Sequence, residues 1–127
     1  MNKVTVLVEG YAHAGENDTY VASPSCVLVE SKGKKVVVDP GANQEKLLAA
    51  LKKVKLTSED IDMVFLSHYH PDHFLAIRLF PKHDIIDGEM IWSEDNEYFH
   101  DKKQIPDTDI KILPTPGHSP QHTALLV

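Results

Sequence analysis

Three histidines and one aspartate crowd into the short run Ser-His-Tyr-His-Pro-Asp-His that begins at residue 67. His68 and His70 are two positions apart, and on an extended chain such residues point to the same side, so both imidazoles can face one metal ion. Pro71 ends the extended segment, and Asp72 and His73 then approach from another direction, which suits a second ion. Imidazole nitrogen and carboxylate oxygen are ligands that zinc prefers, at about 2.0–2.2 Å. The run therefore predicts a site for one or two metal ions.

A further histidine, His118, lies in a run of prolines and glycine at residues 114–120. Such a composition favours a rigid turn over a mobile loop. An isolated loop histidine is most often a solvated surface residue, but the metal-binding pattern upstream makes His118 a candidate ligand. His13, His83 and His100 have no partner motif, and we expect them at the surface or in loops.

Short runs of β-branched and apolar residues predict the strands that must carry these side chains. We expect strands at residues 4–8, 26–30, 35–38, 61–66, 84–86, 90–92, 109–113 and 122–127. The second and third of these strands are close in sequence and predict a hairpin. Residues 10–25 are rich in turn-forming types and are predicted to be a loop. The fourth strand delivers Ser67 and His68 at its carboxyl end.

Helical segments are predicted between the strands. Apolar residues recur at helical spacing between residues 43 and 54, and Asn43 can cap the amino end. Thr57 and Asp60 have the spacing of a capping box on a short helical turn. The apolar run at residues 74–80 is predicted to be a helix that stops at the following proline. Strands with helices between them indicate an α/β or α+β fold.

Composition narrows the class of protein. The chain has 127 residues, of which 42% are hydrophobic, and this suits one soluble domain over residues 1–127. The net charge of −6 does not favour nonspecific binding of nucleic acid. Cys26 is the only cysteine, so no disulfide can form within the chain, and the amino end lacks the pattern of a secretory signal. These two features lead us to expect a cytoplasmic protein. Because no apolar run approaches the roughly 18 residues that cross a bilayer, we expect no membrane partner.

The histidine run at residues 68–73 resembles the HxHxDH signature of the metallo-β-lactamase superfamily. The Pro-Gly-His run that ends at His118 resembles the next ligand motif of that family. The Val-Val-Val-Asp-Pro-Gly run at residues 36–41 resembles the family's hydrophobic strand, which ends in an aspartate and a glycine below the metal site. The resemblance implies the αββα sandwich of this superfamily.

Carried over by position, the resemblance also implies a ligand set. The implied ligands are His68, His70 and His118 for a first ion and Asp72 and His73 for a second. Asp39 would support this site without binding the metal, and His122 resembles a packing or hydrogen-bonding histidine, so it is left out of the metal set. The family's bridging carboxylate and last histidine have no counterpart after His118. We therefore expect a truncated sandwich, its first half only, with one sheet face uncovered and a tendency to form homo-oligomers.

The resemblance implies a metal-dependent hydrolase of small molecules. In the family the metals lower the pKa of a bound water to about 7, producing a hydroxide that attacks a carbonyl or phosphorus atom. Asp72 is then the catalytic residue that orients the nucleophile or passes a proton to the leaving group. The expected substrate is an ester, thioester, lactone, β-lactam or phosphodiester. Zinc is the expected metal, with iron and manganese as alternatives.

Two other functions stay open. Some relatives with this signature bind one iron and oxidise a sulfur substrate, so an iron-dependent oxidoreductase is one alternative. The other is a noncatalytic fragment or pseudoenzyme whose histidines bind metal only for structure. The sequence has no separate nucleophile motif, and Cys26 is expected in the core of a strand.

Overall fold

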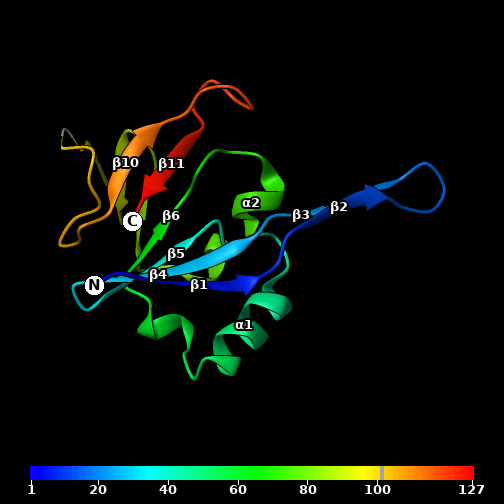
Figure 1. Cartoon of the computed structure of the whole chain (residues 1–127), viewed down its shortest axis with the longest axis horizontal. Coiled ribbons are helices and arrows are strands. Elements are labelled where there is room, and N and C mark those ends of the chain that lie inside the picture. Colours follow the sequence, from blue (N-terminus) through cyan, green and yellow to red (C-terminus); the bar gives the residue numbers. More distant parts are fainter. Residues whose placement is uncertain (101) are drawn as a thin grey trace.

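A mixed sheet of seven strands forms the centre of the protein. A computed structural model describes residues 1–100 and 102–127 (Figure 1). The strands of the sheet are β1 (Lys3–Val8), β4 (Cys26–Ser31), β5 (Lys34–Val38), β6 (Met63–Phe65), β7 (Asp84–Ile86), β8 (Met90–Ser93) and β9 (Asn96–Phe99). They lie in the order β1-β4-β5-β6-β7-β8-β9, with β5–β6 and β6–β7 parallel and the other pairs antiparallel. The predicted mixture of strands and helices is confirmed.

Two hairpins lie outside this sheet. They consist of β2 (Tyr11–Ala14) with β3 (Tyr20–Ser23), and of β10 (Lys111–Pro114) with β11 (Thr123–Leu126). The first hairpin projects beyond the body of the protein (Figure 1). The prediction of a loop over residues 10–25 is therefore wrong. Almost every residue of β2 and β3 is exposed, so these strands lack the alternation of apolar and polar residues by which a strand is predicted. The same exposure explains why β9 was not predicted.

The longest helix, α1 (Gln44–Lys53), confirms the prediction over residues 43–54. The Asn43 side chain accepts a hydrogen bond from the Lys46 backbone N–H at 3.1 Å and so caps the amino end. A short 3-10 turn, η1 (Ser58–Asp60), carries the predicted capping box. In that box the Thr57 backbone N–H donates to Asp60 Oδ2 at 2.7 Å.

The helix predicted at residues 74–80 begins earlier than expected. The structure has α2 (Pro71–Phe74) followed by a 3-10 helix, η2 (Leu75–Leu79). Proline at the first helical position needs no hydrogen-bond acceptor for its nitrogen, so Pro71 both ends the extended segment and starts the helix. Asp72 and His73 consequently lie in the first turn of α2 and not in a loop before it.

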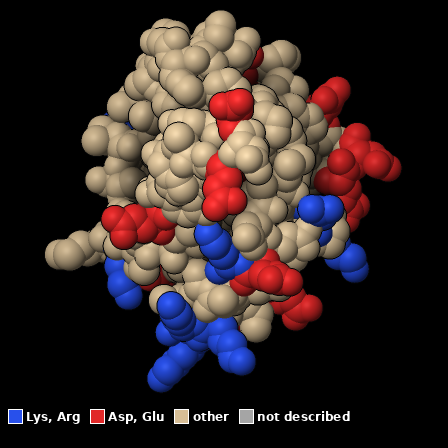
Figure 2. All heavy atoms as spheres, turned by 90° about the vertical axis from the view of Figure 1, so that its right-hand side faces the viewer, with Lys and Arg blue, Asp and Glu red and all other residues tan. Residues whose placement is uncertain are grey.

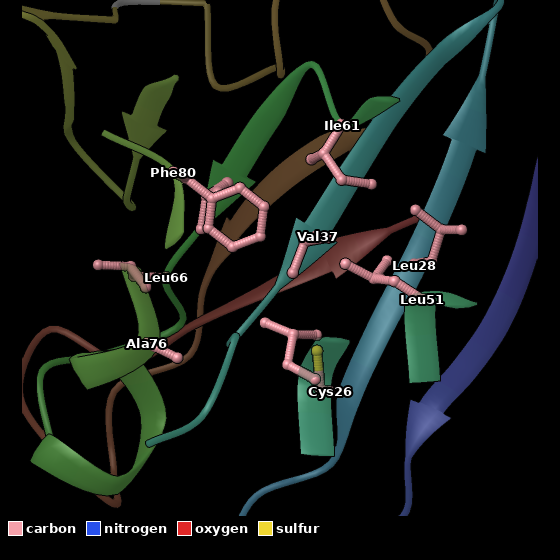
Figure 3. Close-up of a cluster of buried hydrophobic side chains, with 10 residues drawn as sticks. Cys26, Leu28, Val37, Leu51, Ile61, Leu66, Ala76 and Phe80 are labelled. Carbon is pink, nitrogen blue, oxygen red and sulfur yellow. The ribbon is translucent and has the colours of Figure 1, made fainter. Parts of the chain in front are cut away.

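The sheet buries apolar side chains on both of its faces. Val37 and Val64 face α1 and pack with Leu47 and Leu51 in one cluster, of which Figure 3 shows eight labelled members. The neighbouring strand residues point to the opposite face, where they form a second cluster. Its members are Val29, Val36, Met63, Phe65, Ile86, Ile91, Ile105, Ile110 and Ile112.

The second cluster corrects one expectation about the sheet. Ile105, Ile110 and Ile112 come from the chain after β9 and pack over the central strands, so this face is not bare. Both edges of this face remain open: Val4 and Val6 in β1 are 55% and 59% exposed, and Tyr98 in β9 is 48% exposed. The segment around β10 therefore supplies a partial cover that apolar periodicity did not predict.

Candidate metal centre

The carboxyl ends of two parallel strands bring the first site residues together. Asp39 follows β5 and Ser67 follows β6, and parallel neighbours end at the same edge of a sheet. The Asp39 backbone N–H donates to Phe65 O at 2.9 Å, which fixes the two strand ends side by side. Asp39 has a positive φ of 51°, a left-handed conformation that aspartate tolerates better than most residues.

Three imidazoles converge just beyond this edge. His68 Nε2 lies 3.0 Å from His70 Nδ1, and His70 Nδ1 lies 2.9 Å from His118 Nε2. His68 is only 2% exposed, whereas His70 and His118 are exposed to solvent. The predicted first set of ligands is thus assembled from the loop after β6 and from the turn between β10 and β11 (Figure 1).

A hydrogen-bond chain sets the tautomer of His68. Ser67 Oγ lies 2.6 Å from Asp39 Oδ2 and must donate its single proton to that carboxylate. His68 Nδ1, which lies 2.8 Å from Ser67 Oγ, is then the donor to this hydroxyl. The lone pair of His68 is therefore on Nε2, the atom that faces the other two histidines.

This arrangement fits a metal ion. One ring nitrogen of His70 cannot donate to one neighbour and accept from the other at once, so an ordinary two-centre hydrogen bond explains only one of its two short contacts. Nitrogens bound at about 2.0–2.1 Å to a tetrahedral zinc lie roughly 3.3 Å apart, close to the spacing seen here. A cation would remove the repulsion between lone pairs that point at one another.

A second group of potential ligands consists of Asp39, His68 and His73. His73 Nδ1 lies 2.9 Å from Asp39 Oδ2 and donates to it, because a carboxylate can only accept. Asp72, the residue predicted beside His73, is further away, with Oδ2 3.8 Å from His73 Nε2. The structure thus brings His73 next to Asp39 and leaves the Asp72 side chain 39% exposed at the rim.

Burial and neighbouring charges shift the ionisation of this cluster. Burial, followed by the nearby His73 ring, lowers the pKa of His68 to about 4. The hydrogen bond to Asp39 raises the pKa of His73 above its ordinary value. Away from the histidines, burial raises the pKa of the Cys26 thiol to about 12, as expected for a core residue. Neutral His68 keeps the free lone pair that metal binding needs.

The remaining histidines lie outside these two groups. His122 is close to His68, with ring centroids 4.9 Å apart, but its Nδ1 lies 2.9 Å from Thr115 Oγ1. His13 is exposed in β2. His83 and His100 each contact a backbone carbonyl through Nε2, that of Ser58 and that of Asp87 respectively.

Beside His68 the structure has a small pocket of about 100 Å³ that sequence reasoning missed. Tyr69, Asp87 and Glu89 contribute to its wall, and the Tyr69 hydroxyl donates to Asp87 Oδ2 at 2.8 Å. Burial and this hydrogen bond raise the pKa of the Tyr69 phenol above its ordinary value. The Asp-Gly-Glu turn directly after β7 is the one sequence feature that marks this pocket. Its hydrogen-bond partner Tyr69 lies 18 residues earlier in the chain, so the spacing alone does not join the two.

Sequence relatives of the chain include proteins of known and unknown activity. An uncharacterized protein of Aquifex aeolicus is 28% identical over 121 residues, a match that covers 76% of this chain and 55% of that protein. Exodeoxyribonuclease WalJ of Streptococcus pneumoniae is 26% identical over 82 residues, which cover 61% of this chain and 30% of the nuclease. The chain thus spans about half of the first relative and less of the second.

Solved structures with the same fold agree with this relationship. A Thermotoga maritima protein assigned to the metallo-beta-lactamases superposes with a TM-score of 0.75 at 17% identity and covers 99% of this chain and 72% of its own. An N-acyl homoserine lactone hydrolase with bound product superposes with a TM-score of 0.59 at 19% identity, over 86% of this chain and 60% of the hydrolase. These structures confirm the predicted fold.

None of the helices among the described residues has the length and apolar character that a membrane crossing requires.

The sequence itself matches a family model over residues 19–117, which include β5, the histidine run and the Pro-Gly turn before His118. This match covers most of the chain, and it confirms the resemblance on which the ligand set was predicted. The chain belongs to the metallo-beta-lactamase superfamily.

Proposed function

We propose that this protein is a metal-dependent hydrolase and that zinc is held by His68, His70 and His118. The observation that carries the proposal is the approach of three ring nitrogens within 3.0 Å of their neighbours. The hydrolases among the relatives support the class of reaction. When bound, a divalent metal supplies Lewis-acid activation of water near neutral pH.

Asp72 and His73 are proposed to serve a second, weaker metal position. Asp39 fixes the tautomer of His73, so that its Nε2 lone pair turns toward the side on which Asp72 lies. The partly exposed carboxylate of Asp72 can exchange a proton with solvent, as required of a group that serves the leaving group. Zinc needs about four ligands, so two residues of this chain would bind a second ion only weakly.

For the substrate we propose a small uncharged ester, thioester or lactone. The pocket beside His68 holds about 100 Å³, and two carboxylates, Asp87 and Glu89, belong to its lining. Among the described residues around this pocket there is no Lys or Arg that would pair with a phosphate. Figure 2 shows Lys and Arg side chains mainly at the lower end of one face, where α1 lies in Figure 1, with Asp and Glu side chains beside them as well as above them. A phosphodiester substrate, as the nuclease relative suggests, is the competing outcome.

The test measures bound metal and turnover on the same preparations. Wild type and the double variant His68→Ala/His70→Ala are loaded with zinc, iron or manganese, dialysed and analysed for metal content. They are then assayed with thioester, lactone and phosphodiester probes. We expect wild type to retain about one zinc per chain and to prefer the ester probes, and the variant to lose both properties. Equal metal in the two proteins would overturn the ligand assignment.

The same assay separates the alternative functions. Retention of iron together with oxidation of a thiol substrate would favour an oxidoreductase over a hydrolase. Tight metal without turnover of any probe would favour a purely structural site. His13→Ala in exposed β2 serves as the matched control for removal of a histidine.

A further inference from the structure

Tyr69 lies between two candidate ligands but points away from them. In an extended segment neighbouring side chains alternate, so Tyr69 faces the side opposite to His68 and His70. There its hydroxyl donates to Asp87 Oδ2 at 2.8 Å, in the turn between β7 and β8. The loop that carries two metal ligands is thus attached on its reverse side to another part of the sheet.

The acceptor of this hydrogen bond is itself fixed. Asp87 Oδ1 accepts from the backbone N–H groups of Glu89 and Met90 at 2.8 and 2.7 Å. Its backbone carbonyl is 2.8 Å from His100 Nε2, which anchors the turn to the end of β9. Both carboxylate oxygens and the main chain of Asp87 are therefore engaged, and the carboxylate cannot follow a displaced Tyr69 without breaking these contacts.

Packing fixes the ring of Tyr69 as well as its hydroxyl. The ring meets Phe74 and Trp92 edge to face, with centroids 5.9 and 6.4 Å away. The same loop is held from β11, where the Thr123 backbone N–H donates to Ser67 O at 2.9 Å. Gly88 lies against Thr123 so closely that a side chain there would overlap its hydroxyl.

We propose that Tyr69 and Asp87 are positioning residues that hold the His68–His70 segment in the arrangement that binds metal. The proposal rests on the metal site proposed above. His70 is exposed, and as the N-cap of α2 it makes no side-chain capping bond. It therefore depends on its neighbours for order. Without the Tyr69–Asp87 hydrogen bond, metal binding would also have to order His70, and the affinity for the metal would fall.

The test compares Tyr69→Phe, which removes only the hydroxyl, with Tyr20→Phe at a tyrosine that is 70% exposed in β3. Zinc affinity is measured by competition with a chromogenic chelator, and the ligand geometry by the visible absorption of the cobalt-loaded protein. The thermal midpoint of the metal-free protein is recorded separately. We expect Tyr69→Phe to weaken zinc binding by about tenfold and to alter the cobalt spectrum, as loss of an outer contact often does.

Asp87→Asn provides a second variant, since its remaining oxygen can still accept from the Glu89 and Met90 N–H groups. Combined with Tyr69→Phe it should add little further loss of affinity, because the two residues act through one contact. A lower thermal midpoint with unchanged zinc affinity and cobalt spectrum would overturn the inference and leave only a structural role. If wild type itself binds no metal, the proposed function fails and the inference fails with it. Metal binding equal in wild type and Tyr69→Phe overturns the inference alone.

Discussion

Asp39 Oδ2 lies 2.9 Å from His73 Nδ1, although 34 positions separate the two residues in the chain. The same oxygen accepts the proton of Ser67 Oγ, and Ser67 in turn accepts from His68. One buried carboxylate therefore sets the tautomers of two candidate ligands, each with Nε2 left free for a metal. This relationship gives Asp39 a role that can be tested without any assay of activity.

Asp39→Asn should lower zinc affinity by about ten- to a hundredfold. Asparagine tolerates the left-handed backbone of this position, with its φ of 51°, so the substitution changes the side-chain chemistry and not the turn. An amide nitrogen in place of Oδ2 cannot accept from Ser67 and His73. Competition with a chromogenic chelator measures the change. Asp18→Asn, at an exposed left-handed aspartate, is the control, and equal affinities in all three proteins would reduce Asp39 to a turn residue.

The capping box predicts an acid-sensitive contribution to stability. Hydrogen bonds from Thr57 lower the pKa of Asp60 below its ordinary 3.8. A carboxylate with a lowered folded-state pKa stabilises the fold above its unfolded pKa and loses this effect as pH falls through the folded value. Asp60→Asn should therefore reduce the free energy of unfolding at pH 7. The difference from wild type should shrink below pH 3.8.

Denaturant titrations at several pH values check this dependence on Asp60. Glu59→Gln removes a neighbouring negative charge in the same 3-10 turn and serves as the control. If both variants follow the same pH profile, the effect belongs to overall charge and not to the capping box.

Much of the fold could be predicted from the sequence wherever one side of an element is buried. The hairpin of β4 and β5, helix α1 with its Asn43 cap and the strand before His68 were all found, because their apolar residues keep a regular spacing. The exposed hairpin of β2 and β3 and the exposed β9 carry no such spacing and were not predicted.

The residues of the site that share a sequence motif could be predicted, whereas contacts between distant parts of the chain could not. Spacing and family resemblance brought His68, His70 and His118 into one predicted set, and the structure places their nitrogens together. The closeness of Asp39 to His73 and of Tyr69 to Asp87 depends on how separate strand ends meet. No pattern within a short segment encodes such contacts. The assignment of the metal ligands stays a prediction. The assignment of residues 1–127 to one half of a domain stays a prediction as well.

Leu51 should be among the residues on which stability depends most. It is fully buried in the cluster between α1 and the sheet (Figure 3). Leu51→Ala should lower the free energy of unfolding by about 2–5 kcal/mol, because it removes buried methyl groups and leaves a cavity. Leu48→Ala on the same helix, at a side chain that is 44% exposed, should cost far less. Urea titration of both variants measures the difference, and similar losses would contradict the assigned packing of α1.

Removing the histidine of the Pro-Gly turn should abolish the stabilisation of the fold by zinc. His118 Nε2 faces His70 Nδ1 at 2.9 Å, whereas His122 in the same connection turns its Nδ1 to Thr115. A ligand that binds only the folded state at a hundred times its dissociation constant adds about 2.7 kcal/mol to stability. For a domain of this size such a gain corresponds to a rise of roughly 10 °C in the thermal midpoint. We expect this rise in wild type and in His122→Ala, and its loss in His118→Ala. Thermal unfolding with and without zinc, followed by circular dichroism, makes the comparison. If the zinc-dependent rise disappears in His122→Ala and persists in His118→Ala, the third ligand is His122, and the convergence of His118 on His70 has another cause.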